Sequence, residues 1–441
     1  MKSRSLMIAA AVLAALLGLL YWSNRHKPDE SQPTSASPSE PAPVILTLKQ
    51  GDVSRIELKR KGGDQIVLAK DNGGKWRITA PQSLGVDEAA VSGVLSILSS
   101  LNSERLVEEK ATDLGRYGLS APAVEVAITD KNNATHKFLI GDDTPTGNAA
   151  YARLDGDPRV FTIASFTKSG IDKGLNDLRD KRLITVDADR ITRLELTVKQ
   201  QDIEFARDKE QWQILRPKPL RADGTKVDEL VRKLTEAQMD VSADTDASKA
   251  TSAFAAGTVV ATARVTSDAG VEQLEVRKDK EDYYAKSSVA GGVYKVTSDL
   301  GQALDKKLDD FRNRKVFDFG LNDPSKIEIH DGAKAYFLTK GGDDWWSAEG
   351  KKYDPAGALA LVNKLRDLEA TDFTDTGFGP TAVQITVTSN DGKRSEKVSL
   401  SKTDKNVLAR RENESSLYEL DVKAIEDLQK LAGDLKPQAG K

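Results

Sequence analysis

The chain contains no cysteine and only three histidines among its 441 residues. The lack of cysteine excludes disulfides, thiolate metal ligands and a lipoprotein attachment site. It also agrees with an oxidising compartment, where a free thiol can mispair. His26, His136 and His330 have no His or Cys neighbour at ligand spacing, so no zinc site or His-dependent triad can be assembled locally. We interpret His136 and His330 as ordinary strand residues.

A basic surplus is also missing. Lys and Arg number 65 against 68 Asp and Glu, which gives a formal charge of −3. Beyond Lys27 the balance is −7, because residues 1–27 hold four basic residues and no acidic ones. Binding phosphates requires a dense basic face, so nucleic acid is not an expected partner. No glycine-rich phosphate-binding motif follows a predicted strand, and we predict no cofactor.

One long apolar run stands near the start of the chain. Residues 6–22 are uncharged and would span about 26 Å as a helix, close to the thickness of a hydrocarbon core. The run ends in LLYWSNRHK, which lacks the small residues that signal cleavage needs, so an uncleaved anchor is favoured over a cleaved signal peptide. The slight basic excess before the run predicts a cytoplasmic N-terminus. We therefore expect residues 1–27 to anchor an exported body in a bacterial inner membrane, with the lipid bilayer as a partner.

The segment that follows has no core-forming residues. Residues 28–43 contain five prolines and four serines and no Lys or Arg. Such a composition cannot bury a hydrophobic core, so we interpret this segment as a linker between the anchor and the body.

Three tryptophans mark an internal repeat in the body. Trp76, Trp212 and Trp346 lie 136 and 134 residues apart, and each follows a short alternating strand and precedes an amphipathic helix. This spacing is the size of a domain. We therefore predict three tandem repeat modules, at 44–185, 186–317 and 318–436.

Each repeat is predicted to be an antiparallel meander with two helices. In the first repeat the strands are expected at 53–58, 65–68, 76–79, 124–128, 136–140, 150–154 and 160–163. The helices are expected at 86–101 and 168–179, after Asp223 and at 301–311, and from Pro355 and at 424–435. Hairpins interrupted by helices predict the α+β class rather than βαβ units.

Several short motifs carry a resemblance to a known family. The opening GDVSRIELKRKGG, the KWRITAP turn and above all LGRYGLSAPAVEVAI resemble the bacterial family called domain of unknown function 4340. Its aromatic-Gly-Leu-x-x-Pro element recurs as FGLNDP at 319–324 and in reduced form as GFGP at 377–380, while the second repeat has FAAGTVV instead. The resemblance implies an envelope protein associated with ABC-transporter subunits, as in gliding-motility-like systems.

One motif invites a catalytic interpretation. Ser165 and Lys168 have the S-x-x-K spacing of serine acyl-enzymes. Alignment of the repeats places Ser298 and Val422 opposite Ser165, and Gly301 opposite Lys168, so the lysine is not shared. We therefore predict that Ser165 caps a helix.

Acidic pairs invite a metal-binding interpretation. They occur at Asp142-Asp143, in DGDP at 155–158, at Asp244 and Asp246 and at Asp343-Asp344, and none has calcium-loop spacing. Asp beside Gly or Pro between strands is first of all a turn former, and we predict no metal site.

The repeated tryptophans are interpreted as core residues of their repeats. The doubled Trp345-Trp346 is the exception, because neighbouring residues of a strand face opposite sides and one of the two must point outward. Trp345 and Trp346 are therefore the candidate contact surface. We expect a non-enzymatic envelope scaffold or adaptor, accessory to an ABC-type transport system. The alternatives are a periplasmic binding module for an exported polymer or peptide, and a hydrolase with dispersed carboxylates.

Overall fold

The computed structural model describes residues 43–209, 211–242, 246–320, 324–403 and 406–436. Within these ranges no helix combines the length and the apolar character that crossing a membrane requires. The expected anchor and His26 lie outside the described residues, as does the linker up to residue 42. Both therefore stay predictions.

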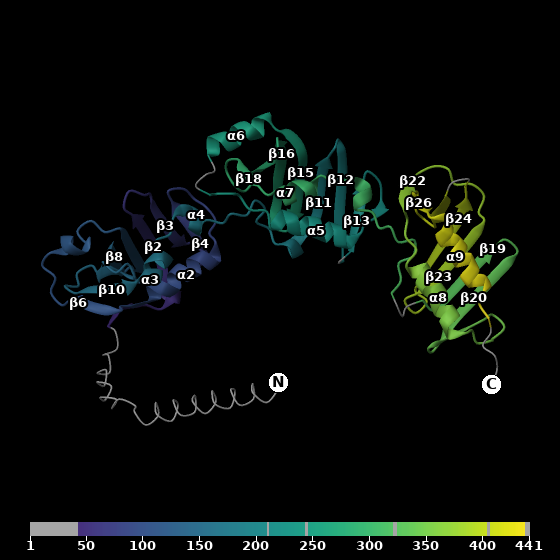
Figure 1. Cartoon of the computed structure of the whole chain (residues 1–441), viewed down its shortest axis with the longest axis horizontal. Helices are drawn as coiled ribbons and strands as arrows, with labels where there is room; N and C mark the ends of the chain where they lie inside the picture. The colour runs from purple at the N-terminus through teal and green to yellow at the C-terminus, as the bar shows by residue number, and fades with distance from the viewer. Residues whose placement is uncertain (1–42, 210, 243–245, 321–323, 404–405, 437–441) are drawn as a thin grey trace, which may run out of the picture. The chain divides into compact units, whose positions relative to one another are not determined.

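The chain separates into two compact units, one ending at Asp180 and the other beginning at Lys181. Unit 1 holds one eight-stranded sheet and a two-stranded sheet, and unit 2 holds two eight-stranded sheets (Figure 1). The strand pairs of these sheets are antiparallel. The predicted α+β class with antiparallel sheets is confirmed. The module boundaries at 185 and 317 stay a prediction.

The first large sheet has the order β4-β3-β2-β7-β8-β9-β10-β6. Its strands are β2 (Val53–Arg60), β3 (Gln65–Lys70), β4 (Trp76–Ala80), β6 (Arg105–Glu108), β7 (Val124–Asp130), β8 (Thr135–Asp143), β9 (Ala149–Leu154) and β10 (Val160–Ala164). The two-stranded sheet pairs β1 (Val44–Thr47) with β5 (Ser100–Asn102). The sequence patterns did not predict β1, β5 or β6.

The second large sheet has the order β14-β13-β12-β11-β15-β16-β17-β18. Its strands are β11 (Ile191–Val198), β12 (Gln201–Asp208), β13 (Gln211–Arg216), β14 (Leu220–Arg221), β15 (Thr258–Ser267), β16 (Gly270–Asp279), β17 (Asp282–Ser287) and β18 (Tyr294–Val296).

The third large sheet has the order β21-β20-β19-β23-β24-β25-β26-β22. Its strands are β19 (Lys326–Asp331), β20 (Lys334–Gly341), β21 (Asp344–Trp346), β22 (Asp372–Thr374), β23 (Val383–Ser389), β24 (Arg394–Lys402), β25 (Val407–Arg411) and β26 (Leu417–Leu420).

The three sheets share one topology around a central antiparallel pair. This pair is β2 with β7, β11 with β15, and β19 with β23, and a meander runs outward from each member. The sheets differ at their edges, because β6 and β22 have no named counterpart in the second sheet, where β14 is added at the opposite edge. The common plan is therefore repeated with local changes.

Helices cover one face of each sheet and close a separate core, and one further helix, α6 (Ala247–Ala256), lies on the opposite face of the second sheet, where the ring of Phe254 packs against Arg277. The covering helices are α2 (Glu88–Ser99), α3 (Ser165–Ile171) and α4 (Leu175–Leu178) in unit 1, and α5 (Gly224–Thr235), α7 (Ser298–Leu304), α8 (Pro355–Arg366) and α9 (Val422–Gly433) in unit 2. Helices α8 and α9 lie side by side over the third sheet (Figure 1). Three large apolar clusters, one per large sheet, result from this packing.

An aspartate starts the first long helix over each sheet. Asp87, Asp223 and Asp354 accept hydrogen bonds from the backbone N–H groups three residues ahead, at 3.0, 3.2 and 2.8 Å. Each cap satisfies an otherwise unpaired amide and stabilises its helix by about 1 kcal/mol. The predicted cap at Asp223 and the first helical position of Pro355 are confirmed.

Two predicted helices are shorter than expected. The helix predicted at 168–179 breaks between α3 and α4, where Asp177 accepts from the N–H of Gly174 at 2.8 Å and starts a new turn. The helix predicted at 301–311 begins earlier, as α7, and ends at Leu304, after which the 3-10 turn η4 (Leu308–Asp310) follows. Asp310 accepts from the N–H of Lys307 at 2.7 Å, so the same break occurs in both places.

The second sheet also carries a helix that the repeat pattern missed. Helix α6 occupies the segment before β15, begins at the side-chain cap of Asp246 and buries Ala250 and Phe254. The expectation of two helices per repeat is therefore only partly matched.

Candidate functional site

The chain passes from the second sheet to the third through a segment rich in arginine. Arg314 donates through Nη1 to the carbonyl oxygens of Ala370 and Thr371 at 3.1 and 2.7 Å. The guanidinium of Arg312 lies 3.5 Å from the ring centroid of Phe373, on β22. These contacts join the end of the second sheet's fold to the edge of the third.

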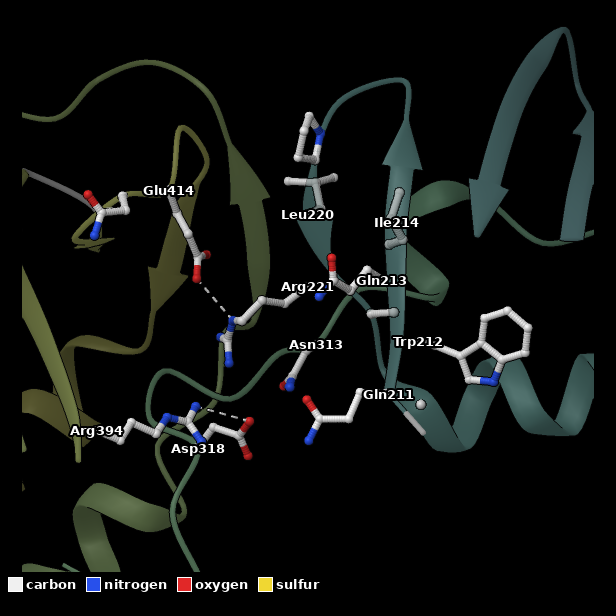
Figure 2. Close-up of a pocket in the computed structure, with 14 residues that line it drawn as sticks. Gln211, Trp212, Gln213, Ile214, Leu220, Arg221, Asn313, Asp318, Arg394 and Glu414 are labelled. Carbon is white, nitrogen blue, oxygen red and sulfur yellow. Dashed lines mark hydrogen bonds and ion pairs between the residues drawn. The ribbon is translucent and has the colours of Figure 1, made fainter. Parts of the chain in front are cut away.

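A cavity of about 520 Å³ lies beside this joint within unit 2 (Figure 2). It opens where β14 ends and the chain turns away from β13 into α5. Its lining residues are Gln211, Trp212, Gln213, Ile214, Pro219, Leu220, Arg221, Ala222, Gly224, Asn313, Asp318, Arg394, Asn413 and Glu414. Its volume lies within the range of small-molecule and peptide-side-chain sites.

Charges on the cavity wall occur in balanced pairs. Arg221 Nε lies 3.1 Å from Glu414 Oε1, and Arg394 Nη2 lies 3.4 Å from Asp318 Oδ2. Figure 2 shows Arg221 reaching toward Glu414, and Arg394 beside Asp318. Because each positive group faces a negative one, these four side chains give the cavity wall no net charge.

A buried ion-pair network lies behind this wall. Arg411 Nη2 binds Glu396 Oε1 at 2.8 Å and Arg411 Nε binds Glu414 Oε1 at 2.6 Å, while Nη1 donates to the carbonyl of Val316. Burial by itself lowers the pKa of Arg411, but the charges of Glu414 and Glu396 outweigh it and the pKa is raised. Arg411 is therefore held as a cation that connects strands β24 and β25 to Val316, in the segment between the second and third sheets.

Tyr418 completes the network from β26. Its hydroxyl donates to Glu414 Oε2 at 2.6 Å and accepts from Arg221 Nη2 at 3.0 Å. Its ring meets that of Phe373 edge to face, with 5.3 Å between centroids. Burial raises the pKa of Tyr418; Glu414 adds to this effect and Arg221 opposes it.

This pKa predicts a stability change at alkaline pH. A folded-state pKa above the ordinary value near 10 means that the contribution of Tyr418 is fully present below pH 10 and is lost as pH rises through the raised pKa. Tyr418→Phe is expected to cost about 1 kcal/mol at neutral pH, through its lost hydrogen bonds. Urea denaturation of the full chain should show this deficit shrinking above pH 10, whereas a deficit constant with pH would contradict it.

Amide side chains supply the neutral polar groups of the cavity. Gln211 and Gln213 are exposed on β13, and their side-chain amides have no hydrogen-bond partner in the described part of the chain. Asn313 accepts from the N–H of Lys315 at 2.9 Å through Oδ1. Figure 2 shows Gln211 and Asn313 on the same side of β13.

The indole of Trp212 is turned away from this space. Its Nε1 donates to Asp228 Oδ1 on α5 at 2.8 Å, and the guanidinium of Arg207 lies 4.9 Å from its ring centroid. Trp212 is buried in the core of the second sheet. Trp212 therefore lines the cavity with its backbone atoms and not with its indole ring.

The serine and lysine of the S-x-x-K motif are engaged elsewhere. Ser165 Oγ donates to the carbonyl of Gly147 at 3.2 Å, and Lys168 Nζ binds Asp143 Oδ1 at 2.7 Å. The prediction that Ser165 caps a helix is wrong, because Ser165 is the first helical residue and the N-cap position belongs to Ala164. The equivalent position before α9 does hold a side-chain cap, Asp421.

The histidines and acidic pairs are dispersed. His136 lies on β8, and His330 lies on β19 with its ring edge to face with Phe337 at 5.6 Å. Among the described residues no group of three or more His, Asp or Glu side chains is arranged to hold a metal ion. Asp244 lies outside those residues.

The tryptophan repeat is corrected by one residue in the third sheet. Trp76 pairs with Lys70, Trp212 with Arg207 and Trp345 with Lys340, so Trp345 and not Trp346 occupies the repeated position. Trp345 is 8% exposed within the third core and Trp346 is 37% exposed, which confirms that one of the pair points outward. Neither lines the cavity, and their role as a contact surface stays a prediction.

The glycine motif is also corrected. In LGRYGLSAP, Gly118 ends a 3-10 turn with a φ of 68° six residues before β7. GFGP also precedes the corresponding strand, β23, and its Gly377 has a φ of 97° six residues before that strand, although Gly377 precedes the aromatic Phe378 whereas Gly118 follows Tyr117. FGLNDP instead lies before β19, at the opening of the third sheet, so it is not the positional equivalent of the other two.

Sequence comparison connects this architecture to a family. The model described as "Domain of unknown function (DUF4340)" matches residues 76–255 and again residues 212–389. The chain belongs to this family. The two DUF4340 matches begin at Trp76 and Trp212, which occupy equivalent places in the first and second sheets, so the family's own model repeats in register with the fold.

Other comparisons add no functional argument. No curated protein matches the chain. Solved structures with some similarity include a DNA polymerase sliding clamp from Pseudomonas aeruginosa with ligand, at 9% identity over 85% of this chain and 93% of that chain, with a TM-score of 0.15. The DNA polymerase III subunit beta from the same organism has 9% identity over 88% and 93%, also with a TM-score of 0.15. Such scores support no conclusion on fold or function.

Proposed function

We propose that this DUF4340 protein is a non-enzymatic adaptor of the bacterial envelope, accessory to an ABC-type transport system. In this proposal residues 6–22 form a single uncleaved helix in the inner membrane, with the N-terminus in the cytoplasm and the body in the periplasm. Residues 44–185, 186–317 and 318–436 form three tandem modules after the 28–43 linker. The family resemblance and the apolar run support this arrangement.

The observation that carries the adaptor proposal is that the charged side chains between the second and third sheets of unit 2 are engaged in ion pairs. Arg221, Arg394 and Arg411 each bind a carboxylate of the same unit. Lys218 binds Asp375 at 2.5 Å, and that hydrogen bond lowers the pKa of the carboxyl. The pairs of Arg221 with Glu414 and of Lys218 with Asp375 join the second sheet's fold to the third. Side chains committed to such contacts favour a role in positioning partners over a role in chemistry.

Purification of the tagged full-length chain in mild detergent tests this proposal. ABC-transporter permease and ATPase subunits are expected to co-purify in a constant ratio to the chain. The matched control is a chain whose residues 6–22 are replaced by an unrelated membrane-spanning helix, which should retain the subunits if the body makes the contact. Recovery of the chain alone after complete solubilisation would contradict the adaptor role.

A second candidate function is favoured by Trp346. Its ring lies against β20, because a Cβ placed on Gly341 would be 2.9 Å from Trp346 Nε1. A partly exposed indole held against a strand suits stacking on a sugar ring or an apolar side chain of an exported polymer. This supports a periplasmic binding module as the alternative to the adaptor.

Trp346→Ala separates binding from folding. Because the indole is partly exposed, its loss should change the free energy of unfolding by less than about 1 kcal/mol. Binding of soluble peptidoglycan fragments, measured by calorimetry on the full chain, is expected to disappear if Trp346 is the contact. Leu359→Ala, at an exposed apolar residue of α8, is the matched control and should bind as the wild type does. Unchanged binding by Trp346→Ala would refute this candidate.

A further inference from the structure

The cavity in unit 2 follows the edge of a strand. Four consecutive residues of β13, from Gln211 to Ile214, line it. Consecutive residues alternate between the two faces of a strand, so a wall made of all four is a backbone edge and not a face. Strand β14 pairs with Gln213 and Ile214 only, and in the described part of the chain no strand pairs with the outer edge at Gln211 and Trp212.

An unpaired strand edge offers N–H and C=O groups to an incoming extended chain. The groups around this edge match a peptide main chain. The free amides of Gln211 and Gln213 can each donate and accept, as peptide groups do. Leu220, which is half-buried, adds apolar surface for an alternate side chain of the bound segment.

The charge of the wall argues for an uncharged ligand. Arg221 and Arg394 face Glu414 and Asp318, so the charges of the wall are already balanced, and a charged ligand group would bring an unbalanced charge into the cavity. A neutral segment leaves both pairs in place.

A sugar ligand is less well matched. Sugar rings bind well against exposed aromatic faces. The only aromatic residue on the described wall is Trp212, and its indole is buried against α5. Hydrogen-bonding groups are present but a stacking platform is not.

We propose that the edge of β13 binds a short, extended, uncharged peptide segment of a partner protein inside this cavity. The bound segment extends the second sheet beside Gln211 and Trp212, beyond the point where β14 ends and the chain turns into α5. This inference deepens the adaptor proposal by naming the form in which a partner is held, but its test requires no transporter.

The probe is an array of nonapeptides of random sequence built from Gly, Ala, Ser, Thr, Asn, Gln, Val and Leu. Matched arrays carry Lys or Asp at the central positions. The full chain in detergent is expected to bind a subset of the neutral peptides, and those peptides should lose binding when a central charge is introduced. Gln211→Ala with Gln213→Ala should weaken the binding about tenfold, through loss of two hydrogen-bonding side chains.

A blocking variant tests the location. A Cβ on Gly224 meets no atom within 4 Å, so Gly224→Leu adds a bulky side chain at the cavity wall and should abolish binding. Gly93, on α2 of unit 1, is equally open, and Gly93→Leu is the matched control that should bind normally. Hydrogen exchange at residues 211–214 should slow when peptide binds the wild type.

Three outcomes overturn the inference: no neutral peptide binds, Gly224→Leu binds as well as Gly93→Leu, or exchange slows only outside residues 211–214. Peptide binding that depends on Gly224, combined with failure to recover transporter subunits, would refute the adaptor proposal and leave this inference standing. Recovery of transporter subunits without any peptide binding would refute this inference and leave the adaptor proposal standing.

Discussion

Replacing Arg411 by methionine is expected to lower the free energy of unfolding of unit 2 by about 3–5 kcal/mol. The Arg411 side chain is 10% exposed and that of its partner Glu396 is 4% exposed. Removing the guanidinium leaves a buried carboxylate without its main counterion and leaves the carbonyl of Val316 without that donor. The desolvated charge that remains is the reason for the large cost, since methionine restores most of the lost volume.

Thermal unfolding of the full chain, with hydrogen exchange to assign the transitions, measures this loss. The transition of unit 2 should fall by about 10 °C, and that of unit 1 should not move. Arg410→Met is the matched control on the same strand, because Arg410 is exposed and its guanidinium lies 4.2 Å from the ring centroid of Phe378. The control should lose about 1 kcal/mol at most. Equal losses in the two variants would contradict a special role for the buried network.

Gly141→Ala is expected to destabilise unit 1 by about 3 kcal/mol, at the upper end of overpacking costs. A Cβ on Gly141 would overlap the carbonyl oxygen of Tyr117, which is backbone and cannot rotate away. Tyr117 and Gly118 belong to the LGRYGLSAP motif, and Tyr117 is fixed by the hydrogen bond of its hydroxyl to Glu108 Oε2 at 2.7 Å. The motif therefore rests on β8 at a distance that only glycine permits.

Urea denaturation of the full chain should show the loss in unit 1 alone. Gly93→Ala is the matched control, since a Cβ there meets open space and alanine favours the helix, with an expected gain of about 0.5–1 kcal/mol. A Gly141→Ala protein as stable as the wild type would mean that the motif is not seated against β8 as described.

The sequence predicted the strands better than the helices. Strict alternation in segments such as β23, whose buried residues are Val383, Ile385, Val387 and Ser389, follows directly from having one covered face. Helix α6 was missed because its Ala, Ser and Thr residues bury only Ala250 and Phe254 and so form no apolar stripe. The breaks after α3 and α7 depend on single aspartate side chains that periodicity does not report.

The tryptophan alignment and the cavity required the fold itself. Spacing along the chain could not decide whether Trp345 or Trp346 is the equivalent of Trp76 and Trp212, whereas the strand pairing of Trp345 with Lys340 does. The cavity brings together side chains that are distant in sequence; Arg221 and Tyr418, which meet behind its wall, are 197 residues apart. No local motif predicts such a site, because its residues are ordinary turn and strand residues in both the second and the third repeat.

The most direct test of contact at the joint is photocrosslinking in living cells. A photoreactive amino acid at Gln213 of the full chain should give a crosslink to an ABC-transporter subunit, mapped to an uncharged extended segment. The same amino acid at Asn132, in an exposed turn of unit 1, should give none. A partner captured equally at both positions, or no crosslink at Gln213, would contradict the account that this protein works by holding a partner segment at the edge of β13.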